Sequence, residues 1–159
     1  MPLQIVSFAI PDLFREVLTE LEPIITKSNL TVGTNLAPDL PPLKTDRQKV
    51  KQILVNLLSN ALKFTQWGTI TIRAEMINLK TISIAVSDTG IGIAEANRAV
   101  IFDDFRQVDS TARRAYGGTG LGLSICRRLT MMLRGTIAVQ SKLGHGSTFT
   151  VTLPTVLRK

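Results

Sequence analysis

The feature that most constrains the fold of this chain is a glycine-rich stretch, Gly117 to Gly122, with four glycines in six residues. It leads directly into an apolar helical pattern that begins at Leu121. Glycines at this density let backbone N–H groups turn toward a ligand, and a helix start adds unpaired N–H donors and the positive end of the helix dipole. The stretch is therefore either an anion site, most simply for phosphate, or a flexible loop that closes onto a helix.

Two common phosphate-binding folds do not fit this stretch. A P-loop ends in Gly-Lys-Ser/Thr, whereas Leu123 and Ser124 follow Gly122 here. A dinucleotide fingerprint needs a glycine where Leu123 stands and a strand before the first glycine, and no strand-like run precedes Gly118. A phosphate site built on this stretch must therefore belong to a different fold.

Length and composition restrict the class of protein further. The 159 residues are enough for one domain with a sizeable core, and a hydrophobic content of 44% is too high for a disordered chain. The formal net charge of +7 favours an anionic ligand, but no basic run is interleaved with aromatics, so we expect no nucleic-acid binding. The lone cysteine, Cys126, excludes an intrachain disulfide and a cysteine-based zinc site.

Hydrophobic periodicity predicts most of the secondary structure. Alternating residues predict strands at 5–8, 30–36, 69–75, 81–87, 136–141 and 147–153. Apolar residues at three- and four-residue steps predict helices at 11–25, with a kink at Pro23, at 47–64 and at 121–133, and a short helix is expected at 95–102. Between them we expect a proline-rich loop at 38–42, a long polar lid at 103–116 and a tail after Pro154.

The predicted helix at 47–64 has Asp46 as its expected N-cap and carries a line of polar residues beside its apolar stripe. Asn56, Asn60 and Lys63 are four and three residues apart, so they lie on one line of the helix. Asparagine is a mediocre helix former, so the line is either a solvated flank or a functional set. In the second case two amide oxygens and an ammonium group point into a cleft and can hold a hard cation and phosphate oxygens.

A second candidate site follows the predicted strand at 81–87. Asp88 stands just off the strand end and is followed by Gly90 and Gly92. Its carboxylate can accept a hydrogen bond from the amino group of a base, and the glycines would let that base approach the backbone closely. The alternative is a turn in which Asp88 accepts from loop N–H groups. The single histidine, His145, lies in a glycine-flanked turn and is expected to be an exposed turn residue.

As a set, these stretches resemble the catalytic ATP-binding domain of sensor histidine kinases, in the superfamily that also holds gyrase, MutL and the ninety-kilodalton heat-shock chaperone. NLLSNALKFT resembles the asparagine box, DTGIGI the first glycine box, IFDDFRQVDS the phenylalanine box and GGTGLGLSI the second glycine box. The resemblance implies an α+β fold, a two-layer sandwich in which a mixed, mostly antiparallel sheet packs on about three helices (the Bergerat fold), with a core from about residue 8 to residue 154. One departure is Asp104, where the phenylalanine box usually has proline.

The resemblance also implies a site for ATP and Mg²⁺. Asp88 would bind the adenine amino group, with Thr148 nearby through water. Asn60 would ligate Mg²⁺, while Asn56 and Lys63 would face the phosphates. The remaining implied nucleotide contacts lie in the two glycine boxes and the lid, with the second set of glycines acting as the lid hinge: Gly90, Gly92, Ile93, Phe105, Arg114, Gly118, Thr119, Gly120, Leu121, Gly122 and Leu123.

Position 56 bears on the expected mechanism. In ATP-hydrolysing relatives the residue four before the metal-binding asparagine is a glutamate, the general base that activates water, whereas the amide of Asn56 cannot take a proton at neutral pH. The resemblance therefore implies transfer of the γ-phosphoryl group to a histidine on a separate, dimeric helical hairpin. That acceptor domain is not recognisable in this sequence, so we expect the isolated chain to be monomeric and unable to autophosphorylate.

The expected context is a longer two-component sensor protein. Its parent would be dimeric, this domain would be cytoplasmic whether or not the parent is membrane-anchored, and a response regulator receiver domain would be the next partner in the phosphorelay. Two alternatives share the fold, an anti-sigma-type serine kinase and a non-catalytic nucleotide-binding interaction domain. The lid resembles the histidine kinase version more closely, and the intact Asn60, Asp88 and glycine boxes argue against a non-catalytic domain.

Overall fold

The computed structural model describes residues 2–65, 67–89, 121–142 and 146–158. The helices in these residues are α1 (Ile10–Lys27), α2 (Arg47–Phe64) and α5 (Leu121–Met132). The strands are β1 (Ile5–Phe8), β2 (Asn29–Leu36), β3 (Leu43–Asp46), β4 (Trp67–Asn78), β5 (Thr81–Asp88), β6 (Thr136–Lys142) and β7 (Gly146–Pro154). Among the described helices, none combines the length and apolar character needed to cross a membrane.

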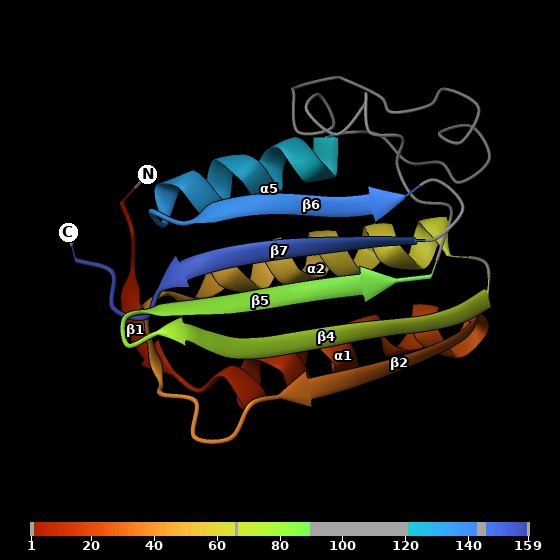
Figure 1. The fold of residues 1–159 in the computed structure, drawn as a ribbon, viewed down its shortest axis with the longest axis horizontal. Helices are drawn as coiled ribbons and strands as arrows, with labels where there is room; N and C mark the ends of the chain where they lie inside the picture. The colour runs from red at the N-terminus through yellow and green to blue at the C-terminus, as the bar shows by residue number, and fades with distance from the viewer. Residues whose placement is uncertain (1, 66, 90–120, 143–145, 159) are drawn as a thin grey trace.

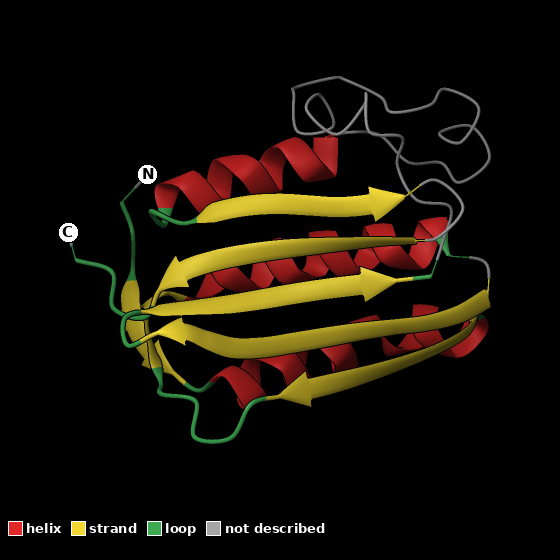
Figure 2. Ribbon diagram, viewed as in Figure 1, coloured by secondary structure: helices red, strands yellow, loops and turns green. Residues whose placement is uncertain are grey.

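These elements form two layers, as Figure 1 shows. A five-stranded sheet in the order β2-β4-β5-β7-β6 makes one layer, and α1, α2 and α5 lie side by side across one of its faces. β2 and β4 are parallel, and the other three strand pairs are antiparallel. The predicted α+β sandwich with a mixed, mostly antiparallel sheet is therefore confirmed (Figure 2).

The alternation along β5 and β7 explains why the helices cover only one face. Ile82, Ile84 and Val86 on β5 and Val151 and Leu153 on β7 are buried in the hydrophobic core together with the apolar residues of the helices. The positions between them are mostly serine and threonine and are only half-buried. A sheet with one apolar face and one polar face needs a covering layer on the apolar face alone.

α2 is the central helix of that layer, and its bounds match the predicted ones. The predicted buried stripe is confirmed, because each of its members has at most 5% of its surface exposed: Val50, Ile53, Leu54, Leu57, Leu58 and Ala61. The helix begins where predicted, since the Asp46 carboxylate accepts a hydrogen bond from the Lys49 N–H at 3.3 Å. A side chain that satisfies an orphan N–H at this position is the usual way in which a helix start is stabilised.

Asp46 also joins β1 to this helix start. Its second carboxylate oxygen accepts from the Gln4 N–H at 3.0 Å and lies 3.5 Å from the Lys49 ammonium. Burial opposes ionisation of this carboxyl, but the two backbone hydrogen bonds and the Lys49 charge outweigh it and hold the pKa of Asp46 below its ordinary value. Folding is therefore linked to the ionised form of Asp46.

We expect Asp46→Ala to destabilise the fold by about 1–2 kcal/mol, since it removes the cap of α2 and the acceptor for Gln4. Urea unfolding at pH 7 measures this loss. Because the pKa of Asp46 is lowered in the folded state, its contribution is complete above the ordinary aspartate pKa and disappears as the pH falls through the folded-state value. The gap between wild type and Asp46→Ala should therefore narrow at acidic pH. Asp46→Asn, which keeps a good N-cap, is the matched control and should lose less.

Two regions differ from the sequence prediction. Leu43–Asp46, where no strand was predicted between the loop at 38–42 and the helix, forms β3, which pairs antiparallel with β1. The residues after Pro154 are not a free tail, because Thr155 and Leu157 are buried. They attach to Lys44 of β3, whose N–H donates to Thr155 O and whose carbonyl accepts from the Leu157 N–H, both at 2.7 Å. α1 spans Ile10–Lys27 and continues as a helix past Pro23.

Candidate functional site

The predicted site residues that the structure describes gather at one end of the molecule. The C-terminal ends of α2, β5 and β6 and the N-terminal ends of α5 and β7 lie at this end, opposite the end that holds both chain termini (Figure 1). It therefore collects Asn60 and Lys63 from α2, Asp88 from β5 and the first residues of β7. Residues far apart in the sequence meet here because the central strands run antiparallel.

Two glycines let the chain at Asp88 lie close to both neighbouring strands. Gly146 of β7 has φ +93°, and a Cβ built there would overlap with the Asp88 carbonyl oxygen. Gly68 of β4 has φ +122°, and a Cβ there would overlap with the Thr89 hydroxyl, which accepts from the Thr69 N–H at 3.2 Å. Positive φ and contacts this close are tolerated only by glycine. The backbone at Asp88 and Thr89 can thus lie close to both neighbouring strands at the end of the sheet.

The structure corrects the prediction for Thr148. This residue alternates with buried Phe149 and lies on the open face of the sheet, where its hydroxyl lies 2.9 Å from the Ser87 hydroxyl in a hydrogen bond. The residue directly opposite Asp88 is Ser147, which is 8% exposed and lies on the helix-covered face. Ser147 therefore replaces Thr148 as the candidate neighbour of Asp88. The period-two pattern of Phe149, Val151 and Leu153 carried this signal in the sequence.

Asn60 has an amide oriented by the helix itself. Its Nδ2 donates to the carbonyl of Asn56 at 2.9 Å, so Oδ1 is the part of the amide turned away from the helix backbone. Among the described residues, no three His, Cys, Asp or Glu side chains come together to hold a metal ion. Mg²⁺ bound with a nucleotide needs few protein ligands, because phosphate and water oxygens complete its shell. The amide oxygen of Asn60 fits that requirement, and the exposed Lys63 follows it on the same helix.

The side chain of Asn56 is engaged with its own helix and with α5. Its Oδ1 accepts from Gln52 Nε2 at 2.9 Å, and the amide also hydrogen-bonds the Cys126 thiol of α5. Burial raises the pKa of Cys126 to about 12, with the bond from Asn56 acting weakly against it, so the thiol stays protonated and inert. Asn56 thus ties α2 to the helix that follows the glycine-rich stretch, a contact that the sequence did not predict.

The remaining predicted contacts divide into two groups. Leu121 and Gly122 begin α5 as predicted, and the side chain of Leu123 is buried in the core, so a nucleotide could meet Leu123 only through its backbone. The other predicted positions lie outside the described residues: Gly90, Gly92, Ile93, Phe105, Arg114, Gly118, Thr119 and Gly120, together with the helix at 95–102, Asp104 and His145.

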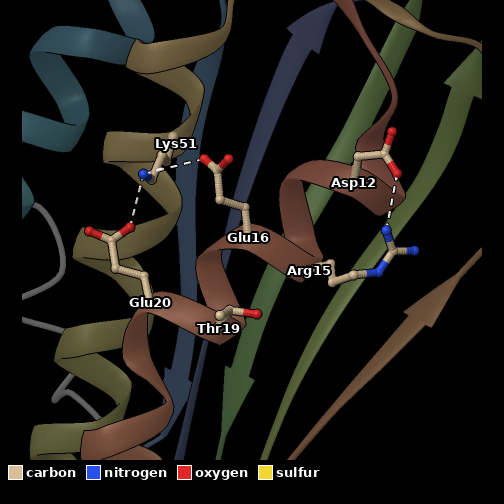
Figure 3. Close-up of a pocket in the computed structure, with 6 residues that line it drawn as sticks. All are labelled: Asp12, Arg15, Glu16, Thr19, Glu20 and Lys51. Carbon is tan, nitrogen blue, oxygen red and sulfur yellow. Dashed lines mark hydrogen bonds and ion pairs between the residues drawn. The ribbon is translucent and has the colours of Figure 1, made fainter.

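An open surface cavity of about 470 Å³ lies beside α1 and α2, and Figure 3 shows the residues that line it. Its charged groups are paired with one another, since Lys51 Nζ lies 2.9 Å from Glu20 and 3.3 Å from Glu16. Arg47 also donates to Glu16, at 3.0 and 3.3 Å. The hydrogen bonds from Arg47 and, as the next cause, from Lys51 lower the pKa of Glu16. The cavity is lined by Asp12, Arg15, Glu16, Thr19, Glu20 and Lys51. Ion pairs that satisfy each other across two helices indicate a packing role.

Comparison with known proteins agrees with this geometry. The family described as histidine kinase-, DNA gyrase B- and HSP90-like ATPase matches residues 45–157. Among curated relatives, the circadian input-output histidine kinase CikA of Synechococcus elongatus is 39% identical over 155 residues, which is 96% of this chain and 20% of that protein. The chain therefore spans about a fifth of the length of this relative.

Solved structures of histidine kinases show the same fold. Full-length ShkA in complex with AMPPNP has a TM-score of 0.86 and 31% identity, covering 97% of this chain and 32% of that one. The catalytic domain of the histidine kinase ThkA has a TM-score of 0.83 and 29% identity, covering 96% and 97%. ThkA in complex with the response regulator protein TrrA has a TM-score of 0.81 and 28% identity, covering 99% and 43%. The chain therefore belongs to the histidine kinase-, DNA gyrase B- and HSP90-like ATPase family, and within it resembles the catalytic domains of sensor histidine kinases.

Proposed function

We propose that this chain binds ATP with Mg²⁺ and acts as the catalytic domain of a two-component sensor histidine kinase, transferring the γ-phosphoryl group to a histidine on a separate helical-hairpin domain. The observation that carries the proposal is Asp88, held at the sheet end between Gly68 and Gly146 in a chain of this ATPase family. Two similar kinases support it, ShkA through its complex with AMPPNP and ThkA through its named catalytic domain.

In this proposal each described residue has a separate task. The Asp88 carboxylate accepts hydrogen bonds from the adenine amino group, beside Ser147. The Asn60 amide oxygen holds Mg²⁺, and the ammonium of Lys63 binds phosphate oxygens. The metal ion, when bound, neutralises phosphate charge and orients the transferred group. The predicted glycine-box and lid contacts outside the described residues remain part of the proposal.

Asn56 favours phosphoryl transfer over hydrolysis of ATP. An amide cannot accept a proton from water at neutral pH, so position 56 supplies no general base. Its side chain is also engaged in hydrogen bonds with Gln52 and Cys126, which do not suit a group that has to accept a proton from water. A site that positions ATP without activating water depends on a nucleophile brought by another domain.

The partners in this proposal lie outside the chain. They are the acceptor hairpin of a dimeric parent protein, on which this domain acts in the cytoplasm, and a response regulator receiver domain. The complex of ThkA with TrrA supports the second partner, and the roughly fivefold greater length of CikA leaves room for the first. No described feature favours the serine kinase or the non-catalytic alternative.

The proposal is tested by supplying the acceptor in trans. With γ-labelled ATP and Mg²⁺, the chain alone should gain no phosphohistidine, because its single histidine, His145, is predicted from the sequence to lie in a turn and not on an acceptor helix. Addition of the separately purified acceptor hairpin of the parent protein should produce acid-labile label on the hairpin, and a hairpin with its histidine replaced by alanine is the control. Label on His145, or no transfer to the hairpin despite ATP binding, would contradict the proposal.

A further inference from the structure

The helix-covered face of the sheet carries a row of three polar residues, at the end of the molecule where the described candidate site residues gather. They are Asp88, Ser147 and Ser141. β7 lies between β5 and β6, so Ser147 has Asp88 as its cross-strand neighbour on one side and Ser141 on the other. Both serines are 8% exposed. Ser141 Oγ lies 2.8 Å from Ser147 Oγ and 3.0 Å from the carbonyl oxygen of Gly146, to which it donates. Buried hydroxyls are nearly always hydrogen-bonded, and these distances are those of hydrogen bonds.

The direction of these hydrogen bonds follows from counting protons. A serine hydroxyl has one proton to donate, and a carbonyl oxygen can only accept. Because the Ser141 proton goes to the Gly146 carbonyl, the contact between the two serines is a hydrogen bond only if Ser147 donates to Ser141. The proton of Ser147 then points toward β6, and the lone pairs of Ser147 Oγ remain for the side on which Asp88 lies.

We propose that Ser141 is a positioning residue for base selectivity: by accepting the proton of Ser147, it turns Ser147 into an acceptor beside Asp88, so that the site takes a base with an exocyclic amino group and rejects one with an oxo group at the same place. The inference rests on the proposed function, since it assumes that Asp88 binds the base of the nucleotide. It adds a residue from β6, a strand that carried none of the predicted contacts.

The chemistry of the two classes of base explains the selectivity. An amino group offers two hydrogens, which can go directly to the Asp88 carboxylate and to Ser147 Oγ. An oxo group brings only lone pairs and would face two acceptors. Leaving polar groups mismatched in a site of low exposure is costly, and such mismatches are how binding sites reject near-isosteric ligands.

A second hydroxyl pair supplies a matched control. Ser87 and Thr148 form a hydrogen bond of 2.9 Å on the neighbouring register position, but on the open face of the sheet. Ser87→Ala removes one hydroxyl from that pair, as Ser141→Ala does from the other. Any general effect of losing a cross-strand hydroxyl pair should appear equally in both variants.

The experiment measures the affinities of ATP and ITP by calorimetric titration with Mg²⁺. ITP carries hypoxanthine, which has an oxo group in place of the amino group at position 6 and a hydrogen on N1. Wild type should prefer ATP. Ser141→Ala frees the Ser147 proton to donate to the oxo group, so the ATP-to-ITP affinity ratio should fall by about tenfold, chiefly through tighter ITP binding. Ser87→Ala should keep the wild-type ratio.

A second pair of variants separates the hydroxyl from the fold. Ser141→Thr keeps a hydroxyl and should keep the wild-type ATP-to-ITP affinity ratio. Ser141→Val introduces a side chain with nearly the shape of threonine but no hydroxyl, and it should lower that ratio. Both threonine and valine are favourable in a strand. An unchanged ratio in Ser141→Ala and Ser141→Val would overturn this inference. Failure of the proposed function is distinguishable, because wild type would then not bind ATP or would bind it equally well after Asp88→Asn.

Discussion

Asp88→Asn is expected to weaken ATP binding by about 100-fold. The carboxylate accepts at both oxygens, whereas an amide must turn an NH₂ group toward one of the places where the adenine amino group or its bridging water donates. The charge-assisted character of the hydrogen bonds is lost as well. The close approach of Gly68 and Gly146 to Thr89 and Asp88 does not depend on the carboxylate, so the backbone should keep its place in the variant.

Calorimetric titration with ATP and Mg²⁺ measures this effect, and thermal unfolding shows whether the fold is intact. Asp88 ends β5 and is only half-buried, so the amide should shift the melting temperature little. Glu75→Gln makes the same acid-to-amide change at an exposed position of β4 and should bind ATP as wild type does. Equal affinity in Asp88→Asn and wild type would refute the role assigned to Asp88.

The parts of the fold that could be predicted from the sequence depend on local interactions. The bounds of α2 were predicted correctly because two local signals specify them. The Asp46 carboxylate accepts from the N–H of Lys49, three residues further along the chain, and the apolar stripe repeats within the same segment. The β4–β5 hairpin was also predictable, since a short turn joins two alternating segments. Both signals lie within a few residues of the structure that they specify.

β3 could not be predicted because its stability comes from distant partners. Its four residues are too few to show an alternating pattern, and they pair with β1 and with the chain after Pro154. The hydrogen bonds of Lys44 to Thr155 and Leu157 span more than a hundred residues of sequence. The expectation of a free C-terminal tail was wrong for the same reason.

The site shows a similar division. The positions of Asn60 and Asp88 could be predicted because each lies near the end of a well-predicted element, and their roles in binding stay predictions. Thr148 was chosen by its place in a motif, although the alternation of β7 puts Ser147 on the side of Asp88. The contact of Asn56 with Cys126 depends on how two helices pack, which no single helix pattern specifies.

Asn60→Ala is expected to lower the rate of phosphoryl transfer to a separate acceptor hairpin by about 100- to 1,000-fold, the usual cost of removing one group that stabilises developing charge. The substitution removes the amide oxygen proposed to hold Mg²⁺. It should leave metal-free ATP binding nearly unchanged, since Asp88 and the base contacts remain. Titration with ATP in the presence of a chelator separates the two effects.

Loss of structure does not account for the expected defect, because alanine is a better helix former than asparagine and the Asn60 bond to the Asn56 carbonyl stays within one helix. Asn60→Ala should therefore unfold at the same temperature as wild type or slightly higher. Asn35→Ala, at an exposed position of β2, controls for the loss of an amide and should transfer phosphate normally. If Asn60→Ala and wild type transferred phosphate equally fast at every Mg²⁺ concentration, the metal would have to be held elsewhere, and the positioning of the phosphates would then depend on the glycine boxes and Lys63 alone.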